Sequence, residues 1–157
     1  MKFSAQEEYG LRCMLCLARI EDGESLTIPQ ISSLEGMTQS HVAKILAILR
    51  KSEFISSTRG QLGGYTLAKS SKDILISDLM ECLGGRLFSS EFCERHTGIE
   101  PTCVHESNCS MRPLWQTIQN AVDSAIQGIT LYDLVHSNFH DSLVQLSPNP
   151  KTPTVSR

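Results

Sequence analysis

Residues 27–67, TIPQISSLEGMTQSHVAKILAILRKSEFISSTRGQLGGYTL, contain the signals that decide the fold. Thr27 and Gln30 have the spacing of a helix capping box, and Gly36 is expected to end the short helix that they begin. Thr38 is expected to cap a second helix, in which apolar residues recur at three- and four-residue intervals. Two helices joined by a tight turn that contains glycine predict a helix-turn-helix.

The helix-turn-helix runs directly into a predicted β-hairpin. Residues 54–58 and 65–67 favour strands, and the glycine-rich segment 59–64 favours the turn between them. A helix-turn-helix followed by a hairpin is a winged helix, so we expect a mainly α-helical fold with a small β-hairpin wing.

Helical patterns flank this unit on both sides. Ser4 and Glu7 form another capping box at the start of a predicted first helix. Ser77 is expected to cap a helix after the wing, and Thr130 a short terminal helix. A long helix is expected from residue 113 to residue 127, beyond an irregular stretch, residues 86–112, that is too long for an ordinary connection.

The charge distribution favours DNA as the partner of the winged helix. The 157-residue chain has a net charge of −3, but residues 38–72 carry six basic and one acidic side chain. This net charge of +5 falls on the helix and hairpin that face DNA in such folds, which outweighs the alternative of a protein-contact module. No secretory start and no apolar run of about 20 residues occur, so we expect a soluble, cytoplasmic protein.

The second helix of a helix-turn-helix reads base edges with its N-terminal side chains, while flanking residues and the wing contact the backbone or minor groove. The predicted DNA-binding residues are Thr38, Gln39, Ser40, His41, Lys44, Lys51, Arg59 and Gly60.

Three cysteines, Cys93, Cys103 and Cys109, lie in the irregular stretch. Cysteines in a polar segment are poorly explained as core residues, and a disulfide framework is not expected in the cytosol. Their spacing lacks the short pairs of structural zinc sites and modestly favours an iron–sulfur cluster. Zinc, with His96 or His105 as a further ligand, and a metal-free thiol switch remain open alternatives.

The other three cysteines are interpreted differently. Cys13 and Cys16 have C-x-x-C spacing but lie on an apolar helix stripe, so we interpret them and Cys82 as small core residues. No phosphate loop, no H-E-x-x-H motif and no nucleophile–base set is present, so an enzyme is not expected.

Over residues 1–136 the chain resembles the Rrf-two family of winged-helix transcriptional regulators, which includes the IscR-, NsrR- and RirA-like iron–sulfur sensors. The resemblance rests on Tyr9-Gly10-Leu11-Arg12, on Pro29-Gln30-Ile31, on Arg59-Gly60 with Leu62-Gly63-Gly64-Tyr65-Thr66-Leu67-Ala68, and on the three cysteines ahead of Leu114-Trp115.

The resemblance implies a homodimeric repressor on a palindromic operator in double-stranded DNA. The long helix would cross its mate through the stripe of Ile118, Val122 and Ala125. The chain is expected to have four parts: a winged helix-turn-helix DNA-binding domain (1–80), a cluster-binding cysteine loop (81–112), a dimerisation helix with a short terminal helix (113–138) and a disordered tail (139–157).

The fourth cluster ligand is the point at which the chain departs from one branch of the family. IscR-type proteins have a ligand histidine three residues after the last cysteine, where this chain has Arg112. The resemblance to NsrR-like relatives implies Glu8 of the other subunit instead, with an ion pair to Arg12 as the alternative role of Glu8. Three cysteines and an oxygen ligand favour [4Fe–4S] slightly over [2Fe–2S].

Overall fold

The computed structural model describes residues 3–21, 23–58, 63–89 and 91–136. The proposed tail and the wing-tip residues Arg59 and Gly60 lie outside these ranges. Within them the elements are α1 (Ala5–Ala18), α2 (Ile28–Glu35), α3 (Gln39–Lys51), β1 (Ile55–Thr58), β2 (Gly64–Leu67), the 3-10 helix η1 (Ser71–Asp73), α4 (Ile76–Gly84), α5 (Phe92–Arg95), α6 (Arg112–Ile126) and α7 (Leu131–Val135).

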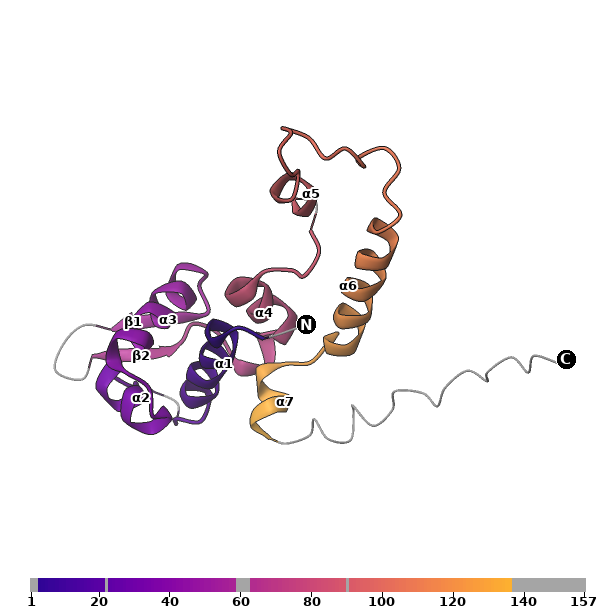
Figure 1. Cartoon of the computed structure of the whole chain (residues 1–157). Helices are drawn as coiled ribbons and strands as arrows, with labels where there is room; N and C mark the ends of the chain where they lie inside the picture. Colours follow the sequence, from indigo (N-terminus) through magenta and orange to yellow (C-terminus); the bar gives the residue numbers. More distant parts are fainter. Residues whose placement is uncertain (1–2, 22, 59–62, 90, 137–157) are drawn as a thin grey trace, which may run out of the picture.

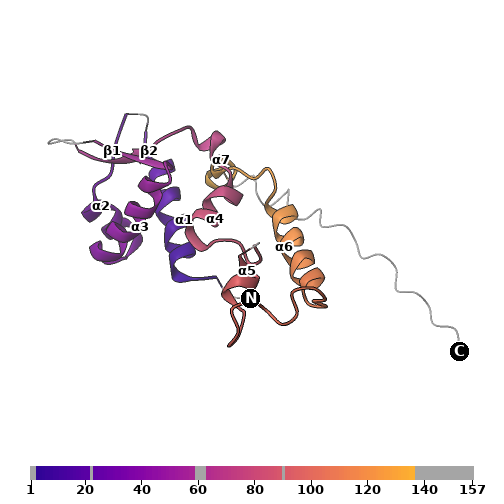
Figure 2. The ribbon, with the colours of Figure 1, turned by 90° about the horizontal axis from the view of Figure 1, so that it is seen from above.

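The expected winged helix is confirmed. Helices α1 to α4 gather on one side of the molecule with the hairpin of β1 and β2 at their edge (Figure 1). The two strands pair antiparallel from Ile55 opposite Leu67 to Thr58 opposite Gly64. Viewed from above, α6 lies on the side away from the hairpin (Figure 2).

Both expected capping boxes are present, and the expected cap at Thr130 is also a capping box. Ser4, Thr27 and Thr130 each accept a backbone N–H from the residue three positions later, and the side chain of that residue reaches back to the cap. These caps satisfy N–H groups that have no partner inside the helix, which explains why sequence alone located the starts of α1, α2 and α7.

The expected cap at Ser77 is wrong. Helix α4 begins at Ile76, after Leu75, whose side chain makes no capping hydrogen bond. The backbone N–H of Ile76 donates instead to the carbonyl of Ile129, at 2.9 Å. A partner far along the chain satisfies the start of the helix, so no local polar residue is needed.

The hydrophobic core lies inside the winged helix. Its buried apolar side chains come from α1, α2, α3, the wing and α4, together with Leu131 of α7. The N–H of Leu131 donates to the carbonyl of Ile74 at 2.9 Å, and Thr130 bridges to Leu75. The chain therefore leaves the core at the end of α4 and returns to it at α7.

Within the described residues, no helix is both long and apolar enough to cross a membrane.

Candidate nucleic-acid interface and cysteine site

The turn between α2 and α3 has the geometry of a helix-turn-helix. Gly36 ends α2 with φ 64°, ψ 33°, a left-handed conformation that glycine adopts without a Cβ penalty. Thr38 then caps α3, because its hydroxyl accepts the N–H of His41 at 3.3 Å. The first turn of α3 is thus fixed by its own sequence.

Helix α3 has two chemically distinct faces. Val42, Ile45, Leu46 and Leu49 are buried in the core, as the apolar spacing predicts. The predicted DNA-binding residues of this helix and its cap are all exposed: Thr38, Gln39, Ser40, His41, Lys44 and Lys51. The core therefore orients the helix so that its polar face is free to enter a groove.

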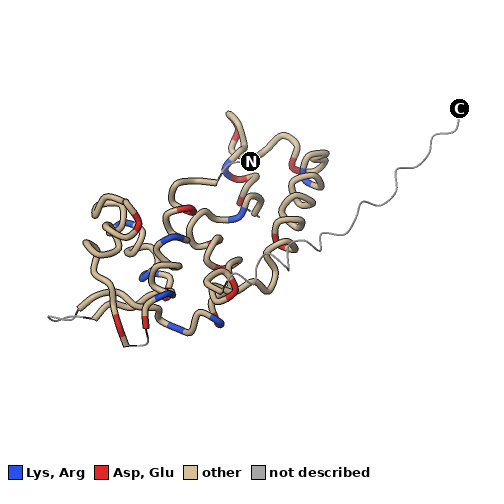
Figure 3. The backbone as a smooth tube through the Cα atoms, turned by 90° about the horizontal axis from the view of Figure 1, so that it is seen from below, with Lys and Arg blue, Asp and Glu red and all other residues tan. Residues whose placement is uncertain are grey.

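Helix α1 lies beside the polar face of α3. The ring of His41 lies 5.9 Å from that of Tyr9, and a small cavity of about 210 Å³ between the helices is lined by both rings and by Lys44. The chain also carries basic positions on α3 and between β2 and α4 (Figure 3). Each of these lies on the winged-helix side.

Arg12 connects α1 to the end of α2. Its Nε donates to Glu35 Oε2 at 2.9 Å, and its Nη2 donates to the carbonyl of Glu35. The hydrogen bond to Glu35 raises the pKa of Arg12, and the negative charge of Glu35 adds to this effect, while burial opposes it. The expected alternative, an ion pair of Glu8 with Arg12, is therefore not formed, and Glu8 is exposed in the first turn of α1.

The cysteine segment leaves α4 at Gly85, whose φ is 74°. Cys93 lies in the short helix α5, while Cys103 and Cys109 lie in irregular chain before α6. All three thiols are half-buried and free. Cys93 and Cys103 line one open cavity of about 1040 Å³, and Cys109 is not part of its lining.

The structure brings two of the predicted ligands to one cavity but does not assemble a set of four. Among the described residues, no group of three or more His, Cys, Asp or Glu side chains is placed to hold a metal ion. His96 stacks on Phe92 at 4.2 Å, with Nδ1 2.7 Å from the Phe92 carbonyl oxygen. His105 is exposed in a turn, so the ligand set remains a prediction.

Cys13 and Cys16 are core residues, as expected. Both are buried, and burial raises the pKa of Cys13 to about 12 and also raises the pKa of Cys16. A thiol with so high a pKa is rarely a thiolate at neutral pH, which leaves it a poor ligand and nucleophile. Cys82 is half-buried and packs against the same core.

Helix α6 carries apolar side chains on two faces. Val122 and Ile126 are half-buried, whereas Leu114 is 53% exposed and Ala121 is exposed. Of the predicted dimer stripe, Ile118 and Val122 are half-buried and Ala125 is exposed. The described part of the chain leaves this side of the helix exposed.

One polar cluster on α6 was not predicted from the sequence. Gln119 is 3% exposed and bonds to the backbone N–H of Phe88 and to Asp123. Asp123 in turn binds Arg86. The signal that could have found it was a glutamine and an aspartate four residues apart on the inner side of an apolar helix.

Comparison with known proteins identifies the family. The family model Rrf2, described as iron-dependent transcriptional regulator, matches residues 3–137. Protein rrf2 of Nitratidesulfovibrio vulgaris is 29% identical over 135 residues, 86% of this chain and 87% of that protein. A Mycobacterium tuberculosis protein named as an HTH-type transcriptional regulator is 26% identical over 94% of this chain and 89% of its own length.

Solved structures give the same fold. CymR, the global cysteine regulator of B. subtilis, superposes with a TM-score of 0.68 at 26% identity, covering 87% of this chain and 98% of CymR. T. potens IscR also gives a TM-score of 0.68, at 22% identity, over 95% of this chain and 94% of its own. This chain therefore belongs to the Rrf2 family of transcriptional regulators.

Proposed function

We propose that this protein is a dimeric, sequence-specific repressor whose affinity for a palindromic operator is controlled by an iron–sulfur cluster. The observation that carries the DNA-binding part is the division of α3 into a buried apolar face and an exposed face of amides, hydroxyls and cations. Gln39 offers an amide suited to adenine, and Lys44 a cation for guanine or phosphate. Arg59 and Gly60 at the wing tip are the proposed minor-groove contacts.

Dimerisation through α6 completes the interface. One protomer reads one half-site, and a two-fold axis between two α6 helices would place the second recognition helix on the other half-site. The exposed apolar residues Leu114, Ala121 and Ala125, with Ile118 between them, support a partner on this side of the helix. The same axis predicts a palindromic target.

The cysteine segment suits a soft, thiolate-bound group. Cys93 and Cys103 line one cavity, their thiols are unpaired, and Cys109 is half-buried just ahead of α6. Soft sulfur ligands select iron–sulfur clusters, zinc or copper(I). Cys93, Cys103 and Cys109 would hold the cluster, with Glu8 of the other subunit as the proposed oxygen ligand. When bound, the cluster would supply a redox-active centre in this segment.

The chain's own residues would then transmit a change in the cysteine segment to the recognition helices. The cysteine segment joins α4, which packs on the winged-helix core, to α6. Any change in the shape of this segment alters how α6 sits on α4, and so the spacing of two recognition helices across the dimer. Half-sites must match a spacing of about 34 Å, so a shift of a few ångströms is enough to weaken binding.

A metal-free thiol switch is the second candidate, favoured by the likeness to Staphylococcus aureus CymR, one structure of which is of an oxidized form. Iron and sulfide analysis of anaerobically purified protein separates the two. We expect both elements and a visible charge-transfer absorption that Cys93→Ser, Cys103→Ser and Cys109→Ser each abolish. Colourless protein with stoichiometric zinc, or with no metal, would refute the cluster.

The operator can be selected directly from random DNA, whichever genes the protein controls. Selection from a random duplex library with the purified protein should recover a palindrome, and Gln39→Ala should relax the preference at one position in each half-site. Recovery of unrelated sequences after several rounds would refute sequence-specific recognition.

A further inference from the structure

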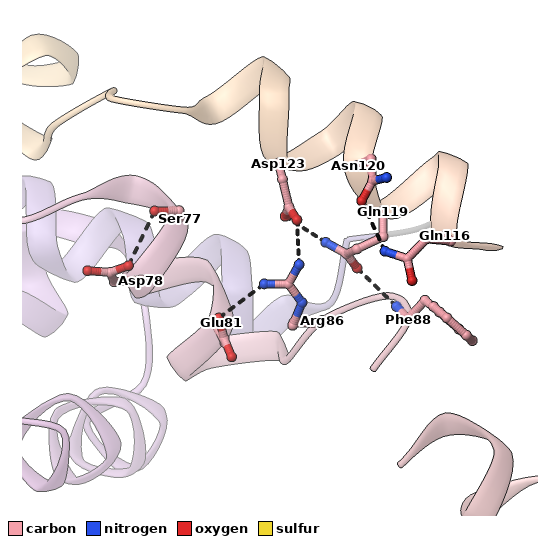
Figure 4. Close-up of polar contacts among 9 residues, drawn as sticks. All are labelled: Ser77, Asp78, Glu81, Arg86, Phe88, Gln116, Gln119, Asn120 and Asp123. Carbon is pink, nitrogen blue, oxygen red and sulfur yellow. Dashed lines mark hydrogen bonds and ion pairs between the residues drawn. The ribbon is translucent and has the colours of Figure 1, made fainter. Parts of the chain in front are cut away.

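A polar network ties the beginning of the cysteine segment to α6 (Figure 4). The side chain of Gln119 receives the backbone N–H of Phe88 on Oε1 at 3.0 Å and donates from Nε2 to Asp123 Oδ1 at 2.7 Å. The other carboxylate oxygen of Asp123 binds Arg86, whose second nitrogen lies 3.6 Å from Glu81 of α4. The network therefore links α4, the start of the cysteine segment and α6, with Gln119 and Asp123 as its members on α6.

The burial of Gln119 makes this network costly to break. Gln119 is the one polar side chain that is buried among the described residues, at 3% exposed. A buried amide that loses its partners carries the full penalty of its desolvation, so Gln119 holds Phe88 more firmly than an exposed residue would. Asp123 and Arg86 are partly exposed, so their ion pair contributes less free energy to the network than the buried amide does.

The network acts close to the first cysteine. Phe88 lies 5.3 Å from Phe92 ring to ring, and Phe92 lies 6.4 Å from Trp115 of α6. Cys93 follows Phe92 directly in α5. The hydrogen bond to Phe88 and the aromatic contacts therefore restrain the same short stretch of chain against the same helix.

We propose that Gln119 and Asp123 are positioning residues of the cysteine site, which hold Phe88 and Arg86 so that the shape of the segment carrying Cys93 is passed to α6. Neither residue is a ligand. They act through the stem of the segment, residues 86–88, and not through the thiols. The consequence for DNA binding rests on the proposed function, whereas the restraint on Cys93 does not.

The restraint is measurable from thiol accessibility in the full-length, metal-free protein. Iodoacetamide labelling followed by mass spectrometry gives the alkylation rate of each cysteine. Gln119→Leu removes both hydrogen bonds at nearly constant volume, and we expect Cys93 to react about tenfold faster, the effect of losing roughly one to two net hydrogen bonds from a local opening equilibrium. Asn120→Leu is the matched control, because among the described residues the side chain of Asn120 bonds only to Gln116 of the same helix.

Cys13 and Cys16 report whether the fold survives, because both are buried in the winged-helix core. If they become reactive in Gln119→Leu, Asp123→Asn provides the milder test, since it keeps the shape and the acceptor but removes the charge that binds Arg86. We expect about a threefold faster reaction of Cys93 in that variant. Equal Cys93 rates in Asp123→Asn and Asn120→Leu, with the core thiols protected, would overturn the proposal.

A double-mutant cycle tests whether Arg86 acts through Asp123. Arg86→Gln combined with Asp123→Asn should react no faster than the more reactive single variant, because both remove the same contact. If the two substitutions multiply their effects on the Cys93 alkylation rate in the double variant, the two residues act separately.

DNA binding distinguishes this inference from the function on which it builds. With iron and sulfide supplied, Gln119→Leu should narrow the difference in operator affinity between loaded and metal-free protein. Faster Cys93 alkylation in a protein whose DNA affinity never responds to iron would leave the positioning role intact and refute the proposed function. Unchanged alkylation with an iron-dependent DNA affinity would refute only the positioning role.

Discussion

Substitution of Lys44 or Lys51 by glutamine is expected to change how salt weakens DNA binding. Both lysines are exposed on α3, seven residues apart, which places them about 10 Å apart along one side of the helix. Neither forms an ion pair within the part of the chain that the structure describes. Their charges are therefore free for phosphate.

The expected change follows from counterion release. Each phosphate contact contributes about 0.9 to the slope of log affinity against log salt concentration, and the proposed dimer would present each lysine twice. Lys44→Gln should therefore flatten the slope by about 1.8. A fourfold rise in salt would then cost the wild type about twelvefold more affinity than the variant, and a Lys44→Gln, Lys51→Gln double variant should flatten the slope by about 3.6.

Fluorescence anisotropy with a mixed-sequence duplex measures this slope, because the phosphate term needs no operator. Arg19→Gln is the matched control: it removes the same charge from an exposed residue at the end of α1, outside the proposed interface. Equal slopes of log affinity against log salt concentration for Lys44→Gln, Lys51→Gln and Arg19→Gln would refute the placement of α3 on DNA. The slope would then depend on the net charge of the protein and not on where the charge lies.

Three further predictions concern stability and reactivity. Gly10→Ala should lower the free energy of unfolding, measured in urea, by about 1 kcal/mol, because a Cβ would overlap the buried side chain of Leu83. Overpacking costs about 1–3 kcal/mol, and the higher helix propensity of alanine offsets about 1 kcal/mol of it, so a raised urea midpoint would contradict this prediction. Thr38→Ala should cost about 1 kcal/mol through the lost cap of α3, while Thr38→Ser should cost little. Cys13, with a pKa of about 12, should resist iodoacetamide at pH 8 until the protein unfolds, whereas Cys93 reacts in the native state, and similar native rates would refute the assignment of Cys13 to the core.

The sequence predicted those elements whose ends are determined locally. Thr27, Gly36 and Thr38 act on backbone groups within a few residues, so their patterns located α2 and α3 nearly to the residue. Ser77 failed because the start of α4 is satisfied by Ile129, a contact that exists only once α7 has folded back. Long-range backbone partners leave no local pattern.

The same distinction explains what was missed at the candidate site. Cys93 and Cys103 were identified from residue type and spacing, and they do line one cavity. The role of Gln119 was not foreseen, because its partner is the backbone of Phe88, and any residue there would present the same N–H. Glu35 was likewise missed, since its pairing with Arg12 depends on how α1 packs against α2.

The distribution of the core limits how the cysteine segment can act. From residue 84 to residue 130, leaving aside the undescribed residue 90, no apolar side chain is buried, and Gln119 is the one buried residue. The winged-helix core closes without this region, because Leu131 returns to it from beyond α6. A rearrangement of the cysteine segment therefore removes little buried apolar surface and need not unfold the DNA-binding unit.

Both ends of this region are fixed to one helix. The segment leaves from the C-terminal end of α4, where Gln6 donates to the carbonyl of Leu83, and the chain returns at the N-terminal end, where Ile76 donates to Ile129. A loop anchored at both ends of a helix cannot drift away from it when its middle changes shape. We expect the change to be taken up instead by the polar contacts of α6 with the stem of the segment. In the proposed dimer, displacement of α6 along α4, and not local unfolding, would then alter the spacing of the two recognition helices.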